Sequence, residues 1–134
     1  MYSLSFRSRQ RLSGVHPDLV AVVKRAIEIT KQDFSVIEGI RSVERQRELL
    51  KSGASTTMNS RHLTGHAVDL APYPFKGDID GDGKINIEDW DQYYPIEKAM
   101  KQAAEELDVD LEWGGDWKTF KDGPHFQLSR KSYP

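Results

Sequence analysis

The sequence contains no cysteine among its 134 residues. Disulfide bonds, thiolate zinc sites and a cysteine nucleophile are therefore excluded, and any bound metal must rest on histidine, carboxylate or backbone oxygen. Histidine is scarce as well, since only His16, His62, His66 and His125 occur. A metal site would have to draw its nitrogen ligands from these four side chains.

Long apolar runs and a strong charge bias are also absent. No stretch approaches the roughly 20 apolar residues of a membrane helix, and the N-terminus lacks the pattern of a signal peptide. The net charge is only -2, with 30% of the residues charged, which is typical of a soluble globular protein without a preference for nucleic acid. We expect one domain, residues 1–134, with no membrane insertion and no nucleic-acid partner.

Helices and short strands are expected in mixed order along the chain. Apolar residues at helical spacing predict helices over residues 17–30, 43–50 and 95–107. Alternating apolar and polar residues predict strands over residues 34–38, 66–71, 111–113 and 125–128. This order favours an α+β domain with a small antiparallel sheet flanked by about three helices.

His62 and His66 have the i, i+4 spacing of a helical zinc-binding motif. However, Leu63 stands where that motif requires glutamate, and the following Thr64-Gly65 disfavours a helix. We therefore interpret the segment as a loop that enters a strand. His62 is expected in the loop, and Asp69 is expected to point inward from the strand.

Residues 60–69 read Ser-x-His-x-x-Gly-x-Ala-x-Asp, and Asp122-Gly123-Pro124-His125 follows far downstream. These motifs resemble the metallopeptidase family that includes D-alanyl-D-alanine carboxypeptidases, vancomycin-resistance dipeptidases and phage L-alanyl-D-glutamate endolysins. The resemblance implies a zinc ion on the sheet, held by His62, Asp69 and His125. A fourth position would stay open for water, as a catalytic zinc requires.

The same resemblance implies two catalytic residues. Asp122 stands at the position of the catalytic carboxylate, which in the family is often glutamate. Arg41, in Glu38-Gly39-Ile40-Arg41-Ser42, matches the segment that carries an arginine near the active site. It is expected to stabilise an oxyanion or to hold a substrate carboxylate, and a purely structural ion pair is the open alternative, because a guanidinium binds carboxylates in either setting.

Residues 78–89 carry a second metal-binding pattern. Oxygen-bearing residues alternate along this loop, with glycine at its sixth position, as in an EF-hand-like calcium loop. The expected calcium ligands are Asp78, Asp80, Asp82, Lys84 through its carbonyl, Asn86 and Asp89. Because the loop follows the Asp69 strand, calcium is predicted to order the segment beside the zinc site; an acidic, solvated turn is the alternative.

Together, the resemblance implies a zinc-dependent endolysin that hydrolyses the L-alanyl-D-glutamate bond of the peptidoglycan stem peptide. The open alternatives are a D-alanyl-D-alanine carboxypeptidase or dipeptidase, a non-catalytic module that binds zinc and calcium, and a calcium-driven interaction domain. We expect a monomer, held in the host cytoplasm until a separate pore-forming protein releases it to the cell wall.

Overall fold

The computed structural model describes residues 1–53, 55, 57–58, 60–74, 91–118 and 121–134. The predicted calcium loop, residues 78–89, lies outside the described residues. The α-helices are α1 (Phe6–Arg11), α2 (Pro17–Ile29), α3 (Val43–Lys51) and α4 (Tyr93–Glu106). The strands are β1 (Phe34–Glu38), β2 (Ala67–Pro72), β3 (Leu111–Trp113) and β4 (His125–Leu128), with 3₁₀ helices η1 (Arg61–Thr64) and η3 (Gly114–Asp116).

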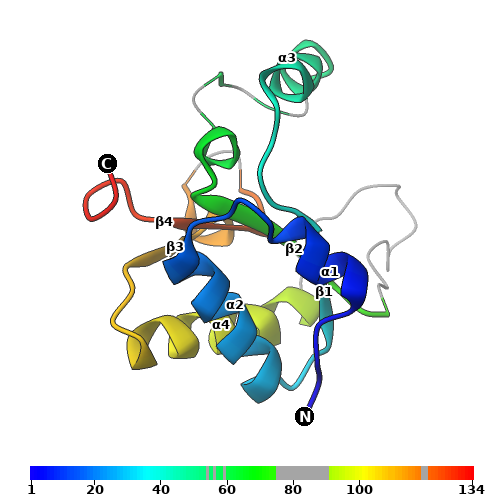
Figure 1. Cartoon of the computed structure of the whole chain (residues 1–134), viewed down its shortest axis with the longest axis vertical. Helices are drawn as coiled ribbons and strands as arrows, with labels where there is room; N and C mark the ends of the chain where they lie inside the picture. Colours follow the sequence, from blue (N-terminus) through cyan, green and yellow to red (C-terminus); the bar gives the residue numbers. More distant parts are fainter. Residues whose placement is uncertain (54, 56, 59, 75–90, 119–120) are drawn as a thin grey trace.

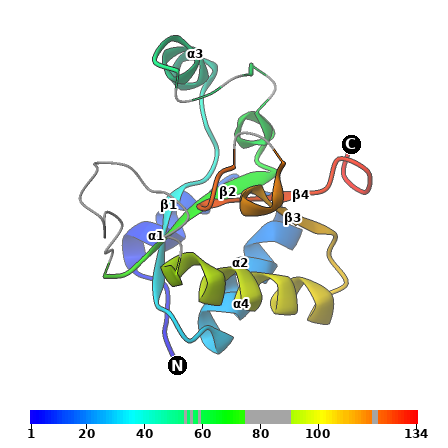
Figure 2. The same cartoon turned by 180° about the vertical axis from the view of Figure 1, so that it is seen from behind.

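The four strands form one sheet in the order β1-β2-β4-β3, and all neighbours in it are antiparallel. Helices α2 and α4 lie together on one side of the sheet, whereas α3 lies on the other side (Figures 1 and 2). The structure thus confirms the α+β class and the small antiparallel sheet. None of the described helices is both long enough and apolar enough to cross a membrane.

The described residues contain one α-helix more than predicted, the short helix α1. Its sequence is rich in arginine, and its one buried residue is Ser8. Hydrophobic periodicity is the main signal by which a helix is found in a sequence, and α1 has none. The prediction of about three helices was therefore too low.

Side-chain alternation gives the sheet two chemically different faces. Apolar residues of the strands join those of α2 and α4 in one buried cluster that includes Leu19, Val68, Leu70, Ile96, Met100, Phe126 and Leu128. Because successive side chains of a strand point to opposite faces, Asp69 and His125 lie on the face away from this core. This polar face carries the candidate site.

Helix α1 covers the free edge of the sheet. The Ser8 hydroxyl accepts a hydrogen bond from the Val36 N–H at 3.0 Å, and Arg11 Nη1 donates to the Val36 carbonyl at 3.0 Å. The chain then passes very close to α1, since a Cβ atom on Gly39 would lie only 2.1 Å from the Arg11 carbonyl oxygen. Only glycine allows this approach. The contacts satisfy backbone groups that an edge strand otherwise leaves unpaired.

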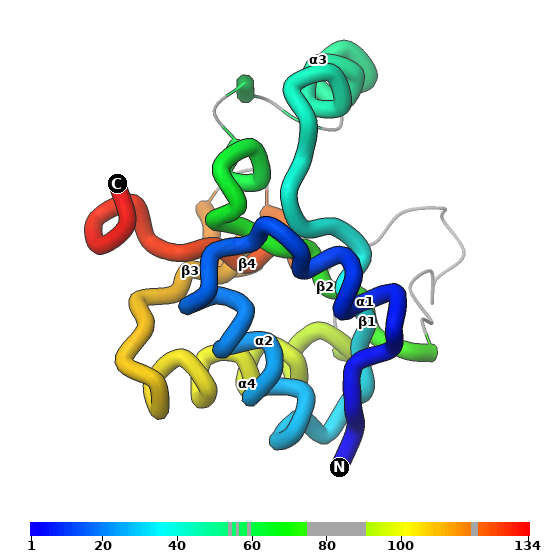
Figure 3. The backbone as a smooth tube through the Cα atoms, viewed as in Figure 1, coloured from blue at the N-terminus to red at the C-terminus, as the bar shows by residue number. Residues whose placement is uncertain are grey.

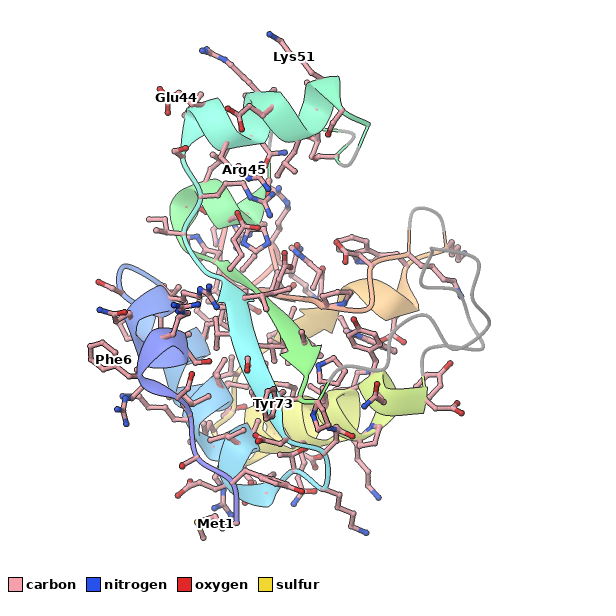
Figure 4. The ribbon with its side chains drawn as sticks, turned by 90° about the vertical axis from the view of Figure 1, so that its right-hand side faces the viewer. Met1, Phe6, Glu44, Arg45, Lys51 and Tyr73 are labelled. Atoms are coloured by element: carbon pink, nitrogen blue, oxygen red, sulfur yellow. The ribbon has the colours of Figure 1, made fainter. Side chains whose placement is uncertain are left out.

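Helix α3 stands apart from the helical layer. The tube in Figure 3 shows the chain leaving β1 for α3 and returning to the sheet through η1. In Figure 4, the labelled Glu44 and Lys51 mark α3 at one end of the molecule, and Met1 marks the other. Gln46 anchors the helix, because its buried amide donates to Ser55 Oγ at 2.8 Å and to the Thr57 carbonyl at 2.6 Å.

Replacing the buried edge hydroxyl should destabilise the fold. Ser8→Ala leaves the Val36 N–H without its partner, and an unsatisfied buried donor costs about 1–3 kcal/mol. Urea denaturation should show a loss of this size in the free energy of unfolding. The matched control is Ser13→Ala, an exposed serine, which should change this free energy by less than about 0.5 kcal/mol. Equal effects of the two substitutions would contradict the role of Ser8.

Candidate metal centre and cleft

Three potential metal ligands meet on the polar face of the sheet. The register of β2 and β4 sets Asp69 opposite His125, and η1 brings His62 to the same point. Asp69 Oδ1 lies 3.1 Å from His62 Nε2 and 3.3 Å from His125 Nδ1. One ligand atom from each of the three residues lies within 4.8 Å of the others. In the part of the chain that the structure describes, no other group of three such side chains has this geometry.

The second nitrogen of each imidazole is held by an acceptor. His62 Nδ1 lies 2.8 Å from the Gly39 carbonyl, and His125 Nε2 lies 2.8 Å from Gln127 Oε1. Since a carbonyl oxygen can only accept, these nitrogens carry the protons, and in the neutral rings the nitrogens that face Asp69 bear lone pairs. Two imidazole nitrogens and a carboxylate oxygen suit a divalent metal, and such outer contacts orient histidine ligands.

The candidate metal centre holds strongly coupled charges. Burial opposes ionisation of Asp69, but hydrogen bonds from His125 and His62 outweigh it and hold the pKa of Asp69 well below its usual range. Burial disfavours the charged form of His125, but the hydrogen bond and negative charge of Asp69 outweigh this effect and raise the pKa of His125. Without a metal, Asp69 therefore favours a protonated His125.

Local backbone contacts place His62. The Ser60 hydroxyl accepts a hydrogen bond from the His62 N–H at 3.3 Å, at the start of η1. The His62 carbonyl in turn accepts from the Arg41 N–H at 2.9 Å. The segment interpreted from sequence as a loop is thus a single 3₁₀ turn. This turn keeps His62 1% exposed.

The two other histidines do not join the metal group. His66 Nδ1 lies 2.7 Å from the Thr64 hydroxyl, and the His66 ring lies 5.4 Å from that of His16. His16 precedes α2 and accepts a hydrogen bond from the Asp18 N–H through Nδ1. Both histidines therefore have local partners, and neither belongs to the group of potential metal ligands.

Asp122 lines the same cleft, which has a volume of about 510 Å³. Its backbone N–H donates to the Gly114 carbonyl at 3.0 Å. A Cβ atom on Gly114 would lie 2.4 Å from the Asp122 carbonyl oxygen, so glycine is needed where η3 meets this segment. Burial and the negative charge of Asp69 raise the pKa of Asp122, although His125, His62 and Arg41 partly oppose this shift.

Arg41 reaches the cleft as part of an ion-paired network. Its guanidinium donates to both carboxylate oxygens of Glu38, at 2.8 and 2.7 Å, and to Gln46 Oε1 at 2.7 Å. Arg41 Nη2 also lies 3.6 Å from Asp69 Oδ2. A register shift between Val36 and Glu38 sets Glu38 opposite Asp69. The ion pair foreseen as an alternative is present, and a role of Arg41 toward substrate stays a prediction.

Two residues beside His125 were missed from the sequence. Gln127 Nε2 donates to Glu112 Oε2 at 3.1 Å, and these residues are cross-strand partners on β4 and β3. Their polar side chains alternate with buried apolar neighbours, which was a usable signal. Their contact with each other depends on the strand register, which the sequence motifs do not contain.

Comparison with known proteins identifies the family. A sequence model described as phage L-alanyl-D-glutamate peptidase matches residues 1–131. The chain belongs to this family. The resemblance inferred from the two motifs is therefore confirmed, and the chain is a peptidase.

Curated relatives and a solved structure agree with this assignment. The chain is 34% identical to the L-alanyl-D-glutamate peptidase of Escherichia phage T5, over 94% of this chain and 88% of the relative. It is 33% identical to the peptidoglycan L-alanyl-D-glutamate endopeptidase CwlK of Bacillus subtilis, over 85% of this chain and 75% of the relative. The crystal structure of the L-Ala D-Glu endopeptidase ChiX of Serratia marcescens superposes with a TM-score of 0.82 at 48% identity, over 96% of this chain and 91% of that one.

The charge coupling predicts how the metal-free protein responds to pH. The pKa of His125 is raised on folding, so the stability it contributes is fully present below its unfolded pKa of about 6.5 and is lost as pH rises through the raised value. Asp69, whose pKa is lowered, is ionised throughout this window. Asp69→Asn should therefore reduce the free energy of unfolding more at about pH 5.5 than at about pH 9.

Urea denaturation with a chelator present measures this difference. The control is Asp116→Asn, because Asp116 pairs with Lys101 at 2.7 Å and a lysine stays protonated across the window. Its effect should be nearly independent of pH. An Asp69→Asn effect that is equally flat would show that Asp69 does not stabilise a protonated histidine.

Proposed function

We propose that this chain is a zinc-dependent endopeptidase that hydrolyses the L-alanyl-D-glutamate bond of bacterial peptidoglycan stem peptides. The observation that carries the proposal is the convergence of His62, Asp69 and His125 in a cleft that Asp122 also lines. The names of the T5, Bacillus and Serratia relatives support the choice of bond.

The donor set fits a catalytic metal better than a structural one. His62 would bind through Nε2, His125 through Nδ1 and Asp69 through a carboxylate oxygen. Three protein ligands leave a tetrahedral zinc with one open position, whereas a structural zinc takes four. When bound, zinc would supply Lewis acidity, which lowers the pKa of water and polarises a carbonyl group.

Asp122 is the general base and then the general acid in this proposal. Its carboxylate takes a proton from the attacking water and returns it to the amine that leaves the scissile bond. Its raised pKa in the metal-free protein has burial and the charge of Asp69 as its main causes. A cation held by Asp69 would weaken the repulsion between Asp69 and Asp122 and would lower the pKa of Asp122 again, because an opposite charge favours the ionised carboxylate.

Arg41 contributes electrostatic stabilisation. Glu38 and Gln46 hold the guanidinium in place, 3.6 Å from Asp69. A positive charge fixed before the reaction stabilises the oxyanion that develops on the carbonyl. Because Glu38 already occupies two of its donors, we favour this role over the capture of a substrate carboxylate.

The calcium prediction adds regulation to the proposal. Its six ligands, Asp78, Asp80, Asp82, Lys84, Asn86 and Asp89, rest on sequence spacing alone. The segment that contains them joins the end of β2 at Pro72 to the start of α4 at Tyr93. Since β2 carries Asp69, calcium binding would order the chain that directly follows a metal-ligand strand.

The proposed biological setting follows from the same family. The substrate partner is the stem peptide of the cell wall, and the enzyme acts as a monomer. It waits in the host cytoplasm until a separate pore-forming protein gives it access to the wall, as expected for an endolysin.

Loss of the Asp122 carboxylate should abolish catalysis while leaving the metal bound. Asp122→Asn should lower kcat about 10²–10⁴-fold, because general acid–base catalysis contributes about this much. Release of new amino groups from purified peptidoglycan, with mass analysis of the products, measures the loss, and zinc content is determined on the same samples. Asp116→Asn, an exposed aspartate on η3, is the control and should retain activity.

The products discriminate between the alternatives. New amino termini on D-glutamate support the proposal, whereas free D-alanine would indicate a carboxypeptidase. If the wild type releases no product while zinc and calcium are both bound, this cleft would be assigned to a non-catalytic binding module in place of a peptidase.

Removal of calcium should reduce activity without removing zinc. A chelator selective for calcium should lower the rate of peptidoglycan hydrolysis several-fold, and added calcium should restore it. The double substitution Asp78→Asn with Asp80→Asn should weaken this calcium response, because it removes two of the predicted ligand charges. Full activity in the calcium-free, zinc-loaded enzyme would refute calcium regulation and leave the zinc peptidase proposal intact.

A further inference from the structure

A row of hydrogen bonds runs from the candidate metal centre across two strands. His125 Nε2 lies 2.8 Å from Gln127 Oε1, and Gln127 Nε2 donates to Glu112 Oε2 at 3.1 Å. The His125 and Gln127 residues are only 6% and 8% exposed. The bond between His125 and Gln127 is thus shielded from water, where a hydrogen bond has its greatest effect on its neighbours, whereas Glu112 is half-buried.

The direction of these hydrogen bonds is set from the Glu112 end. An ionised carboxylate can only accept, so it requires the NH₂ group of the Gln127 amide to face it. The amide oxygen must then face His125, and this oxygen requires a proton on Nε2. In the neutral ring, Nδ1 is left with its lone pair directed toward Asp69, 3.3 Å away.

We propose that Glu112 and Gln127 are positioning residues that select the His125 tautomer with Nδ1 free to bind the metal. The inference rests on the zinc site of the proposed function. It adds two residues that line the same cleft and act on the metal through His125.

We call the row formed by Glu112, Gln127 and His125 the relay. A comparison with His62 shows why Glu112 is needed behind Gln127. The partner of His62 Nδ1 is the Gly39 carbonyl, which cannot reverse its role. The partner of His125 is an amide, which can rotate and present NH₂ in place of oxygen. Asp69 favours such a reversal, because its carboxylate attracts a proton to the His125 Nδ1. Glu112 opposes it, since a rotated Gln127 would turn its oxygen toward the Glu112 carboxylate.

Zinc affinity is the quantity that tests the relay. Titration of the metal-free protein against a chromophoric chelator measures it without any peptidase assay. Gln127→Leu removes the acceptor at similar volume and should weaken zinc binding by about 10–100-fold, the usual effect of losing an outer-shell partner. Glu112→Gln keeps the acceptor but allows the amide to rotate, and it should weaken binding by a smaller factor, on the order of 3–10-fold.

The exchanged pair is the matched control. Gln127→Glu combined with Glu112→Gln preserves composition and charge, and it still places an acceptor against His125 Nε2 with a donor behind it. This double variant should bind zinc within about threefold of the wild type, whereas Gln127→Glu alone, which brings two carboxylates together, should not. Circular dichroism with a chelator present checks that each variant is folded.

A double-mutant cycle separates a relay from two independent effects. If Glu112 acts through Gln127, then Glu112→Gln should cost no further affinity in the Gln127→Leu background. Additive losses, or an exchanged pair as weak as Gln127→Leu, would overturn the relay. Such a result would leave the peptidase proposal standing, because that proposal fails only if the wild type binds no zinc or cleaves no stem peptide.

Discussion

Antiparallel pairing of β2 with β4 in one register is the constraint on which the candidate site depends. It sets Asp69 directly opposite His125 while Leu70 and Phe126 enter the core on the other face. A slip of one residue would send the polar side chains into the core and the apolar ones into the cleft. The burial of the apolar face therefore fixes the geometry of the ligands, although those ligands contribute nothing apolar to the fold.

Residues that come from outside the sheet are held by close backbone contacts. The Gly39 carbonyl accepts a hydrogen bond from His62 Nδ1, and the Gly114 carbonyl accepts one from the Asp122 N–H. At both glycines a Cβ atom would collide with a neighbouring carbonyl oxygen. These contacts fix the positions of His62 and Asp122 relative to the sheet. Side chains far apart in sequence therefore share one cleft.

The charges of the site are arranged around Asp69. His62, His125 and Arg41 all lie near its carboxylate. The hydrogen bonds from His125 and His62 hold the pKa of Asp69 low in spite of burial. A buried charge is costly unless it is paired, so these partners offset the cost of burying the Asp69 carboxylate even without a metal. A divalent cation fits the same arrangement, because its charge can take the place of the proton that Asp69 otherwise favours on His125.

Much of this molecule was predictable from the sequence, for reasons that are local. The strands over residues 34–38, 111–113 and 125–128 match the structure as predicted, since alternation records which face of a strand is buried. The helices α2, α3 and α4 were found through their apolar stripes and caps, whereas α1 escaped because it buries a serine. The three candidate ligands were recognised because two short motifs resemble those of a metallopeptidase family.

The contacts between segments were decided only by the tertiary structure. Strand register decides that Glu112 meets Gln127 and that Glu38 forms an ion pair with Arg41. Close backbone approach decides that the Gly39 carbonyl lies beside His62 Nδ1. A sequence records what each residue can donate or accept. Which partner it meets is decided by the packing of the core on the opposite face of the sheet, and this packing brings together residues that no local pattern connects.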